Sequence, residues 1–284
     1  MAEWRAPDAR TTVVGVIGYP VRHSLSPLLH NTAFAALELN WVSAAFEVVP
    51  GRVAAALDGM RALGVAGLSV TMPHKADAAA LADERSAVVD TLGVANCVIN
   101  REGTLRAENT DGAGFLASLA RRAGFEAAGK RCLIIGAGGA ARAVTLALAD
   151  AGAATVTVVN RTGARAADVA ALAGAAGRVG RTGDESEAEA ADLVVNATPV
   201  GMTETDEGDS GWLVAPSWLH RGQVVADLVY APRPTPWLAA AGQTGAIVVD
   251  GLGMLVHQAA AQLELWTGRP APVDRLWQAA SDAV

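Results

Sequence analysis

The chain is poor in cysteine and in aromatic residues. Its 284 residues include two cysteines, Cys97 and Cys132, and only 5% are Phe, Trp or Tyr. Both cysteines lie in apolar runs, so we expect buried, unreactive thiols rather than a disulfide. The sequence contains no Cys or His spacing typical of a zinc site, and no metal is expected. These shortages exclude the small proteins that depend on disulfides or zinc for their stability.

Positive charge is also scarce. There are 22 Lys and Arg residues against 29 Asp and Glu residues, which gives a formal net charge of −7. Proteins that bind duplex nucleic acid normally carry a basic face that neutralises phosphates. Because the basic residues here are scattered, we expect no nucleic-acid partner. Local positive groups must then hold any anionic ligand.

Long hydrophobic runs are absent, although 51% of the residues are hydrophobic. No run approaches the roughly 20 apolar residues that span a membrane, and residues 1–10 lack the apolar core of a signal peptide. We therefore expect no membrane partner and a cytoplasmic location. The hydrophobic content instead predicts large buried cores, and the Ala-rich runs predict helices that pack closely on a sheet.

Short apolar runs alternate with segments of helical spacing. This β-α-β-α order predicts an α/β fold with a mainly parallel sheet, and the length favours two domains. Residues 202–211, which are acidic and rich in Thr, Asp and Gly, are expected to form an exposed loop. Strands are expected at residues 12–17, 42–49, 67–70, 131–135, 155–159, 193–196 and 224–229, and helices at 26–39, 52–63, 110–123, 140–151, 252–265 and 273–283.

A glycine-rich turn follows the expected strand at 131–135 and opens the next helix. It reads Gly136-Ala137-Gly138-Gly139-Ala140-Ala141, in the context that a dinucleotide-binding turn requires. Gly136 would permit the tight turn, Gly138 would let the backbone approach a pyrophosphate, and Ala141 would let helix and strand pack closely. Free N–H groups at the helix start would bind the pyrophosphate. The alternative is a tight turn that binds no ligand.

The end of the following strand indicates which dinucleotide is bound. NAD-dependent enzymes usually carry Asp or Glu there, which accepts hydrogen bonds from the ribose hydroxyls. This chain has Asn160-Arg161-Thr162, with Arg165 three residues further on. Two guanidinium groups and a hydroxyl can bind a ribose 2′-phosphate, so we expect NADP. The alternative is that both arginines lie on a solvated helix face.

Four polar segments lie where expected strands end or helices start, the positions that form the binding crevice of an open α/β sheet. In the first, Ser24 and Ser26 are two residues apart, so both hydroxyls can face one side of an extended chain and bind a carboxylate. Alternatively, Ser26 caps the helix that Pro27 enters. The segments are residues 18–31, 69–75, 93–96 and 109–112.

In their order and spacing, these segments resemble the shikimate dehydrogenase family. The resemblance includes residues 196–202, 227–232 and 251–258, and it runs from about Val14 to about Gly268. It implies a substrate-binding and catalytic domain at residues 1–110, completed by C-terminal helices at 251–284, and a Rossmann NADP-binding domain at 111–250. It also implies an oxidoreductase that reversibly reduces 3-dehydroshikimate to shikimate with NADPH, in aromatic amino acid biosynthesis by way of chorismate. Family members occur as monomers and dimers, so a homodimer stays open.

The resemblance also implies roles for individual residues. Lys75 and Asp111 would be the catalytic pair. Hydride delivery to a ketone creates an alkoxide, to which an ammonium group can donate a hydrogen bond and a proton. The substrate would be bound by Ser24, Ser26, Thr71, Lys75, Asn96, Asp111, Tyr230 and Gln258. NADP would be bound by Gly136, Ala137, Gly138, Gly139, Ala140, Asn160, Arg161, Thr162 and Arg165, with backbone contacts to the nicotinamide from Leu228 and Gly251.

Three alternative functions share much of the same pattern. A quinate or quinate/shikimate dehydrogenase would share the catalytic pair and the serines, but the neutral Asn160 argues against an NAD-linked catabolic enzyme. An aminoshikimate dehydrogenase is not separated by the sequence. A non-catalytic NADPH-binding sensor would predict damage to the catalytic pair or the serines, and all of these residues are present. The chain departs from the family at Cys97, where Thr is more common, and at Ala87, where some relatives carry an acidic residue.

Overall fold

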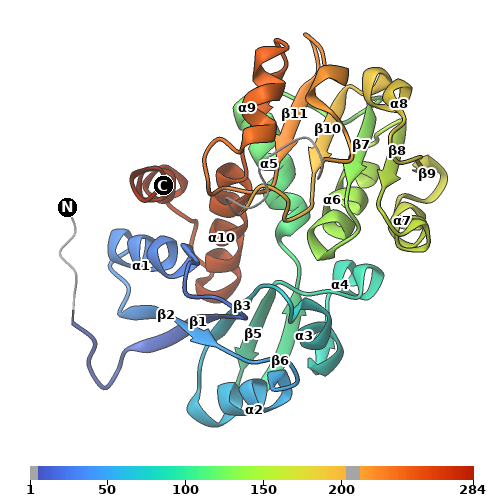
Figure 1. Ribbon diagram of the computed structural model, residues 1–284. Coiled ribbons are helices and arrows are strands. Elements are labelled where there is room, and N and C mark those ends of the chain that lie inside the picture. The colour runs from blue at the N-terminus through green and yellow to red at the C-terminus, as the bar shows by residue number, and fades with distance from the viewer. Residues whose placement is uncertain (1–5, 203–211) are drawn as a thin grey trace. The chain divides into compact units, whose positions relative to one another are not determined.

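The computed structural model describes residues 6–202 and 212–284 (Figure 1). The chain divides into two compact units. The first contains the described residues up to Thr110 together with Leu255–Ala283, and the second contains those between Asp111 and Met254. Each unit is built on a six-stranded sheet with helices, so the predicted α/β class is confirmed. Residues 203–211 of the expected loop lie outside the described residues.

The first sheet is mixed. Strand β1 (Thr12–Gly18) pairs in parallel with β2 (Trp41–Glu47) and β3 (Gly67–Val70). Strands β5 (Cys97–Arg101) and β6 (Thr104–Glu108) form an antiparallel hairpin beside β3, and β4 (Glu84–Arg85) completes the order β2-β1-β3-β5-β6-β4. The expectation of parallel strands therefore missed this hairpin, whose two-residue turn at Glu102 and Gly103 has positive φ at both positions.

Helices cover both faces of the first sheet. On one face α2 (Val53–Leu63), α3 (Lys75–Leu81) and α4 (Ala87–Leu92) pack on a core that includes Leu68 and Val98. On the opposite face lie α1 (Ser26–Ala36), α10 (Leu252–Thr267) and α11 (Val273–Asp282). Gly67 precedes Leu68 in β3, so its Cβ position faces the opposite side of the sheet. A side chain at Gly67 would overlap the Trp266 indole of α10. The strand therefore needs glycine where the helix crosses it.

The second sheet is entirely parallel, with the strand order β12-β11-β10-β7-β8-β9. The strands from β11 to β9 can be followed side by side in Figure 1. Its strands are β7 (Arg131–Ile135), β8 (Thr155–Val159), β9 (Gly177–Val179), β10 (Leu193–Asn196), β11 (Val224–Asp227) and β12 (Ile247–Val249). Its helices are α5 (Asp111–Ala123), α6 (Gly139–Asp150), α7 (Gly163–Ala170), α8 (Glu185–Ala190) and α9 (Pro236–Gln243), with 3-10 turns at Ala171–Ala176 and Pro216–Trp218.

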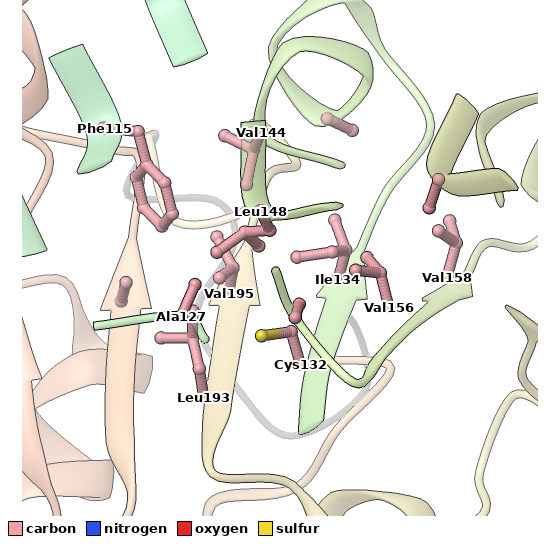
Figure 2. Packing of buried hydrophobic residues seen from close by; sticks show 14 of the residues in the cluster. Phe115, Ala127, Cys132, Ile134, Val144, Leu148, Val156, Val158, Leu193 and Val195 are labelled. Carbon is pink, nitrogen blue, oxygen red and sulfur yellow. The ribbon is translucent and has the colours of Figure 1, made fainter. Parts of the chain in front are cut away.

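Alternate strand residues face the two layers of helices. Figure 2 shows Ile134, Val156 and Val195 packed with Val144 and Leu148 of α6 and with Phe115 of α5. The intervening strand residues, such as Leu133 and Val194, pack with α9 on the other face. Both faces are therefore buried, which explains why these strands read as continuous apolar runs.

Small residues let the helices of this layer approach closely. The Cβ position of Gly112 in α5 lies 2.8 Å from both the Ala143 carbonyl oxygen and the Ala147 Cβ of α6. A larger residue at Gly112 or Ala147 would push the two helices apart. The alanine and glycine residues thus allow α5 and α6 to pack closely, as the Ala-rich sequence predicted.

The two cysteines are free and buried. Burial raises the pKa of the Cys97 thiol well above its usual range and raises the pKa of Cys132 to about 12. The predicted burial of both thiols is confirmed, and a thiol that stays protonated is a poor nucleophile.

Over residues 6–202 and 212–284, no helix combines the length and the hydrophobicity needed to cross a membrane. In the same part of the chain, no three His, Cys, Asp or Glu side chains are grouped so that they could hold a metal ion.

Candidate active site

Polar loops meet at one edge of the first sheet. Strands β1 and β3 are parallel, so their carboxyl ends share an edge, and Tyr19 N–H donates to the Met72 carbonyl across the two following loops (3.0 Å). Because β5 is antiparallel to β3, its beginning lies at that same edge, and Val70 N–H donates to the Asn96 carbonyl (2.8 Å). Strand β6 ends there too, since Glu108 pairs with Cys97.

The two serines lie in contact in the loop that follows β1. Ser26 is buried at the first position of α1, and its N–H donates to Ser24 Oγ (3.2 Å). The hydroxyl of Ser24 in turn lies 3.2 Å from Ser26 Oγ. The N-cap residue is Leu25 and no side chain caps the helix, so the alternative that Ser26 caps α1 is wrong. The two adjacent hydroxyls are suited to bind one carboxylate group.

Asn96 and Gln258, both predicted to bind substrate, are joined by a hydrogen bond. Asn96 Nδ2 donates to Gln258 Oε1 (2.9 Å). Thr110 completes the cluster, because its N–H donates to Asn96 Oδ1 (2.8 Å) and its hydroxyl to the Gln258 carbonyl (3.2 Å). The sequence interpretation missed Thr110, although it quoted the segment that contains it. Thr71, the residue after β3, has its N–H bound to the Ile17 carbonyl (2.9 Å).

The proposed catalytic residues begin two helices. Lys75 is the half-buried first residue of α3, and its carbonyl accepts a hydrogen bond from Ala95 N–H (2.8 Å), next to Asn96. Asp111 is the buried first residue of α5 and follows Thr110 directly. Lys75 belongs to the first unit, whereas Asp111 and Tyr230 belong to the second.

The glycine-rich turn of the second unit fits a dinucleotide. Gly136 has φ of +112°, and a Cβ there would lie 2.9 Å from the Ala197 carbonyl oxygen. Gly138, the N-cap of α6, has no atom within 4 Å of its Cβ position, so a ligand can approach its backbone. No side chain caps α6, which leaves its first N–H groups for a pyrophosphate. Ala141 is fully buried against the sheet, as expected.

Two free guanidinium groups follow β8. Asn160 Nδ2 donates to the Thr162 carbonyl (3.1 Å), and Thr162 is the N-cap of α7 without a side-chain cap bond. Arg161 and Arg165 are exposed, and neither makes an ion pair within the described residues. Unpaired arginines at a neutral strand end and a helix N-terminus are suited to bind a phosphate.

Leu228 and Gly251, the residues expected to offer backbone contacts to the nicotinamide, are neighbours. Leu228 N–H donates to the Asn196 carbonyl (2.9 Å), and Gly251 N–H donates to the Val229 carbonyl (3.2 Å). A Cβ at Gly251 would overlap the carbonyl oxygen of Leu228. Only glycine permits this close backbone approach.

Asp227 is a functional candidate that the sequence interpretation missed. It is buried at the end of β11, where its carboxylate accepts hydrogen bonds from Asn196 Nδ2 (3.0 Å), Val229 N–H (3.0 Å) and Thr235 Oγ1 (2.7 Å). Burial raises the pKa of Asp227 to about 6, against the lowering effect of these bonds. The sequence feature that could have identified Asp227 is an acidic residue at the end of an apolar strand, just before Leu228.

The histidines of the first unit occupy different environments. His23 is exposed beside the serines. His74 is buried, with Nε2 2.6 Å from the Val48 carbonyl oxygen. His30 is buried in α1, with its ring edge-on to Trp266 at 4.8 Å between centroids.

Known proteins resemble this chain over most of its length. Residues 16–98 match the shikimate dehydrogenase substrate binding domain, 118–203 match the shikimate/quinate 5-dehydrogenase family, and 251–280 match the shikimate 5′-dehydrogenase C-terminal domain. A shikimate dehydrogenase (NADP(+)) of Moorella thermoacetica is 47% identical over 272 residues, which cover 93% of this chain and 91% of the relative.

Solved structures agree with the sequence comparison. A shikimate dehydrogenase crystallised with NADP+ has a TM-score of 0.90 at 34% identity, covering 98% of this chain and 97% of the other. The quinate dehydrogenase of Corynebacterium glutamicum, in complex with NAD, has a TM-score of 0.87 at 30% identity, covering 96% and 99%. The chain belongs to the shikimate dehydrogenase family.

Proposed function

We propose that this chain is an oxidoreductase that catalyses the reversible NADPH-dependent reduction of 3-dehydroshikimate to shikimate, a step of aromatic amino acid biosynthesis. The proposal rests on the presence of two kinds of site in one chain of this family. The Asn96–Gln258 cluster is suited to bind the substrate, and the Gly136 turn with Arg161 and Arg165 is suited to bind the cofactor. Bound NADPH would supply the hydride, and NADP+ would accept it in the reverse direction.

Lys75 and Asp111 would manage the proton. The Lys75 ammonium would donate a hydrogen bond to the ketone oxygen and then the proton that neutralises the alkoxide. The carboxylate of Asp111 would orient that ammonium and accept a hydrogen bond from a substrate hydroxyl. Both residues begin helices whose backbones are held in place, Lys75 by Ala95 and Asp111 by the preceding Thr110, which supports such positioning roles.

The serines would bind the substrate carboxylate. Ser24 Oγ accepts the N–H of Ser26 and donates to Ser26 Oγ, and its hydroxyl would turn that proton to the carboxylate when substrate binds. The Ser26 hydroxyl supplies a second neutral donor and Tyr230 would supply a third. Neutral donors bind an anion without placing a fixed cation in the site. Thr71, Asn96 and Gln258 would then bind the ring oxygens.

The choice of NADP over NAD would depend on Arg161, Thr162 and Arg165. A 2′-phosphate carries close to two negative charges at neutral pH and can accept several charge-assisted hydrogen bonds. An acidic residue in place of Asn160 would repel it. The neutral amide and the two unpaired guanidinium groups support NADP as the preferred cofactor.

We assign the substrate-binding and catalytic domain to residues 1–110 with 251–284, and the NADP-binding domain to residues 111–250, from which Asp111 and Tyr230 would also serve the substrate. A cytoplasmic location and a homodimer stay predictions. Sedimentation of the purified chain over a range of concentrations would test the dimer, and a single monomer boundary throughout would contradict it.

The decisive experiment compares two substrate and cofactor pairs. The purified chain should oxidise NADPH when 3-dehydroshikimate is added, and should reduce NADP+ with shikimate faster than NAD+ with quinate. Quinate is the rival because a relative at 30% identity is a quinate dehydrogenase. An enzyme that prefers quinate with NAD would refute the proposal, and so would a chain that binds NADPH without turnover, as a sensor would.

A further inference from the structure

A line of buried polar groups crosses the first unit from β2 to α10. Nδ1 of His30 lies 3.3 Å from the Ser43 hydroxyl. Gln262 Nε2 donates to the Asn96 carbonyl (3.0 Å) and to Gln258 Oε1 (3.1 Å), which Asn96 Nδ2 also reaches (2.9 Å). Ser43, His30, Asn96 and Gln262 are buried. Gln258 is only half-buried, so it forms the end of the line that a ligand can reach.

Backbone groups decide which way the amides of this line point. A side-chain amide can be flipped, so its oxygen and nitrogen must be assigned from their partners. The N–H of Thr110 can only donate, and it meets one end of the Asn96 side chain (2.8 Å), which must be the oxygen. The Asn96 carbonyl can only accept, so the end of Gln262 that meets it must be the nitrogen.

Two nitrogens of known identity thus converge on one atom of Gln258. Asn96 Nδ2 and Gln262 Nε2 both donate to it, so this atom is the carbonyl oxygen of the side chain. The amide nitrogen of Gln258 consequently points the other way. Gln258 is fixed as a hydrogen-bond donor toward anything that binds beside it.

His30 completes the line at the other end. His30 Nε2 and Gln262 Oε1 are buried atoms without a hydrogen-bond partner in the described chain. Burial lowers the pKa of His30 to about 3, while the Gln262 side chain acts in the opposite direction. The ring is therefore neutral and carries one proton. Because Gln262 Oε1 can only accept, a proton on Nε2 suits both atoms and leaves Nδ1 to accept from Ser43 Oγ.

We propose that His30 and Gln262 are positioning residues that hold Gln258 with its amide nitrogen toward the substrate, so that the substrate group there must be an oxygen acceptor. The inference rests on the proposed function and deepens it. A proton on His30 Nε2 would let the ring donate to Gln262 Oε1, which would keep the Gln262 nitrogen turned toward Gln258, and hydrogen bonds aligned in this way reinforce one another. A hydroxyl or carbonyl oxygen fits this donor, whereas an ammonium group does not.

The test measures the KM for shikimate in His30→Leu and Gln262→Leu. In Gln262→Leu the Gln258 oxygen keeps only the donor from Asn96, and in His30→Leu the Gln262 amide loses its support. Gln258 is then held less firmly, so we expect the KM for shikimate to rise about tenfold, the effect of losing one good hydrogen bond. The KM for NADP+ and kcat should change less than about twofold. His30→Gln can still offer an N–H to Gln262 and should restore most of the affinity.

A buried glutamine of the second unit supplies the matched control. Gln223 Nε2 donates to the carbonyls of Ala188 (2.7 Å) and Ala191 (2.9 Å). Gln223→Leu should lower the melting temperature as Gln262→Leu does, but leave the KM for shikimate unchanged. If Gln262→Leu and His30→Leu lose only stability and keep the parental KM, the positioning roles are refuted. A parent that uses quinate and not shikimate would instead refute the proposed function, and the same KM ratios would then be measured with quinate.

Discussion

The hydroxyl of Thr235 donates a 2.7 Å hydrogen bond to the buried carboxylate of Asp227. The same hydroxyl accepts from Leu238 N–H (3.2 Å) as the N-cap of α9. Asp227 also accepts hydrogen bonds from Asn196 and Val229, so one carboxylate joins the end of β10 to the loop after β11. Leu228, the expected nicotinamide contact, lies between Asp227 and Val229.

Asp227 should make the stability of the protein depend on pH. Its pKa rises from an ordinary 3.8 to about 6 in the folded chain, so folding favours the protonated form. The stabilisation is complete below pH 4 and is lost as the pH rises through 6. The difference corresponds to about 3 kcal/mol. Urea unfolding between pH 4 and 8 should show this loss in the parent and not in Asp227→Asn.

Parallel pH curves for the parent and Asp227→Asn would contradict this account. Thr235→Val provides a second measure, because it removes a donor that favours the ionised carboxylate and should raise the pKa of Asp227 further. It should also cost about 1–2 kcal/mol through loss of the N-cap. Thr235→Ser keeps both hydrogen bonds and should behave as the parent does.

Removal of the Lys75 ammonium should affect the chemical step more than binding. In Lys75→Ala we expect kcat to fall by about a hundredfold to ten-thousandfold, the range typical of a general acid, with a change of a few-fold in the KM for shikimate. Steady-state kinetics with saturating NADP+ would measure both. A raised KM with an unchanged kcat would show that Lys75 binds the substrate without taking part in proton transfer.

Arg161 and Arg165 should distinguish NADP+ from NAD+. The double variant Arg161→Ala/Arg165→Ala should raise the KM for NADP+ by about tenfold, a modest effect because both side chains are exposed. The KM values for NAD+ and shikimate should stay the same, and added salt should reduce the difference. Arg181→Ala, which removes an exposed charge from the same unit, is the control. An equal loss for NAD+ and NADP+ would rule out a 2′-phosphate contact.

Gly136 should tolerate no side chain. An alanine there would need φ of +112° and would crowd the Ala197 carbonyl oxygen and Thr198 Cγ2, both 2.9 Å from the Cβ position. Gly136→Ala should therefore destabilise the chain by more than about 1 kcal/mol and weaken NADPH binding. Gly59→Ala, in open space within α2, should stabilise by about 0.5–1 kcal/mol. Thermal unfolding and NADPH fluorescence titration would compare the two variants.

The sequence predicted the second unit better than the first. The buried parallel strands at 131–135, 155–159 and 193–196 agree with β7, β8 and β10, because continuous apolar runs are a strong signal. The helix expected at 26–39 ends at Ala36, since Glu38 adopts a positive φ that composition does not announce. The short strands β4, β9 and β12 were missed because they depend on neighbours distant in sequence.

Residues that act alone were easier to find than residues that act through others. The glycine turn was predicted from its place between a strand and a helix, and Lys75 and Asp111 were predicted from the resemblance of their segments to the family. Gln262, Thr110 and Asp227 became candidates only through buried partners, Asn96 for the first two and Asn196 for Asp227, which the sequence does not place beside them. Their roles depend on tertiary contacts, and only the structure brings those contacts into view.

Each unit contains one cysteine, and both thiols are shielded from solvent. The native chain can therefore serve directly as a background for maleimide chemistry. One surface cysteine introduced into each unit would accept a dye or a spin label while Cys97 and Cys132 stay unmodified. Distance measurements on such doubly labelled protein, with and without NADPH and shikimate, would follow any closure of the two units during the catalytic cycle.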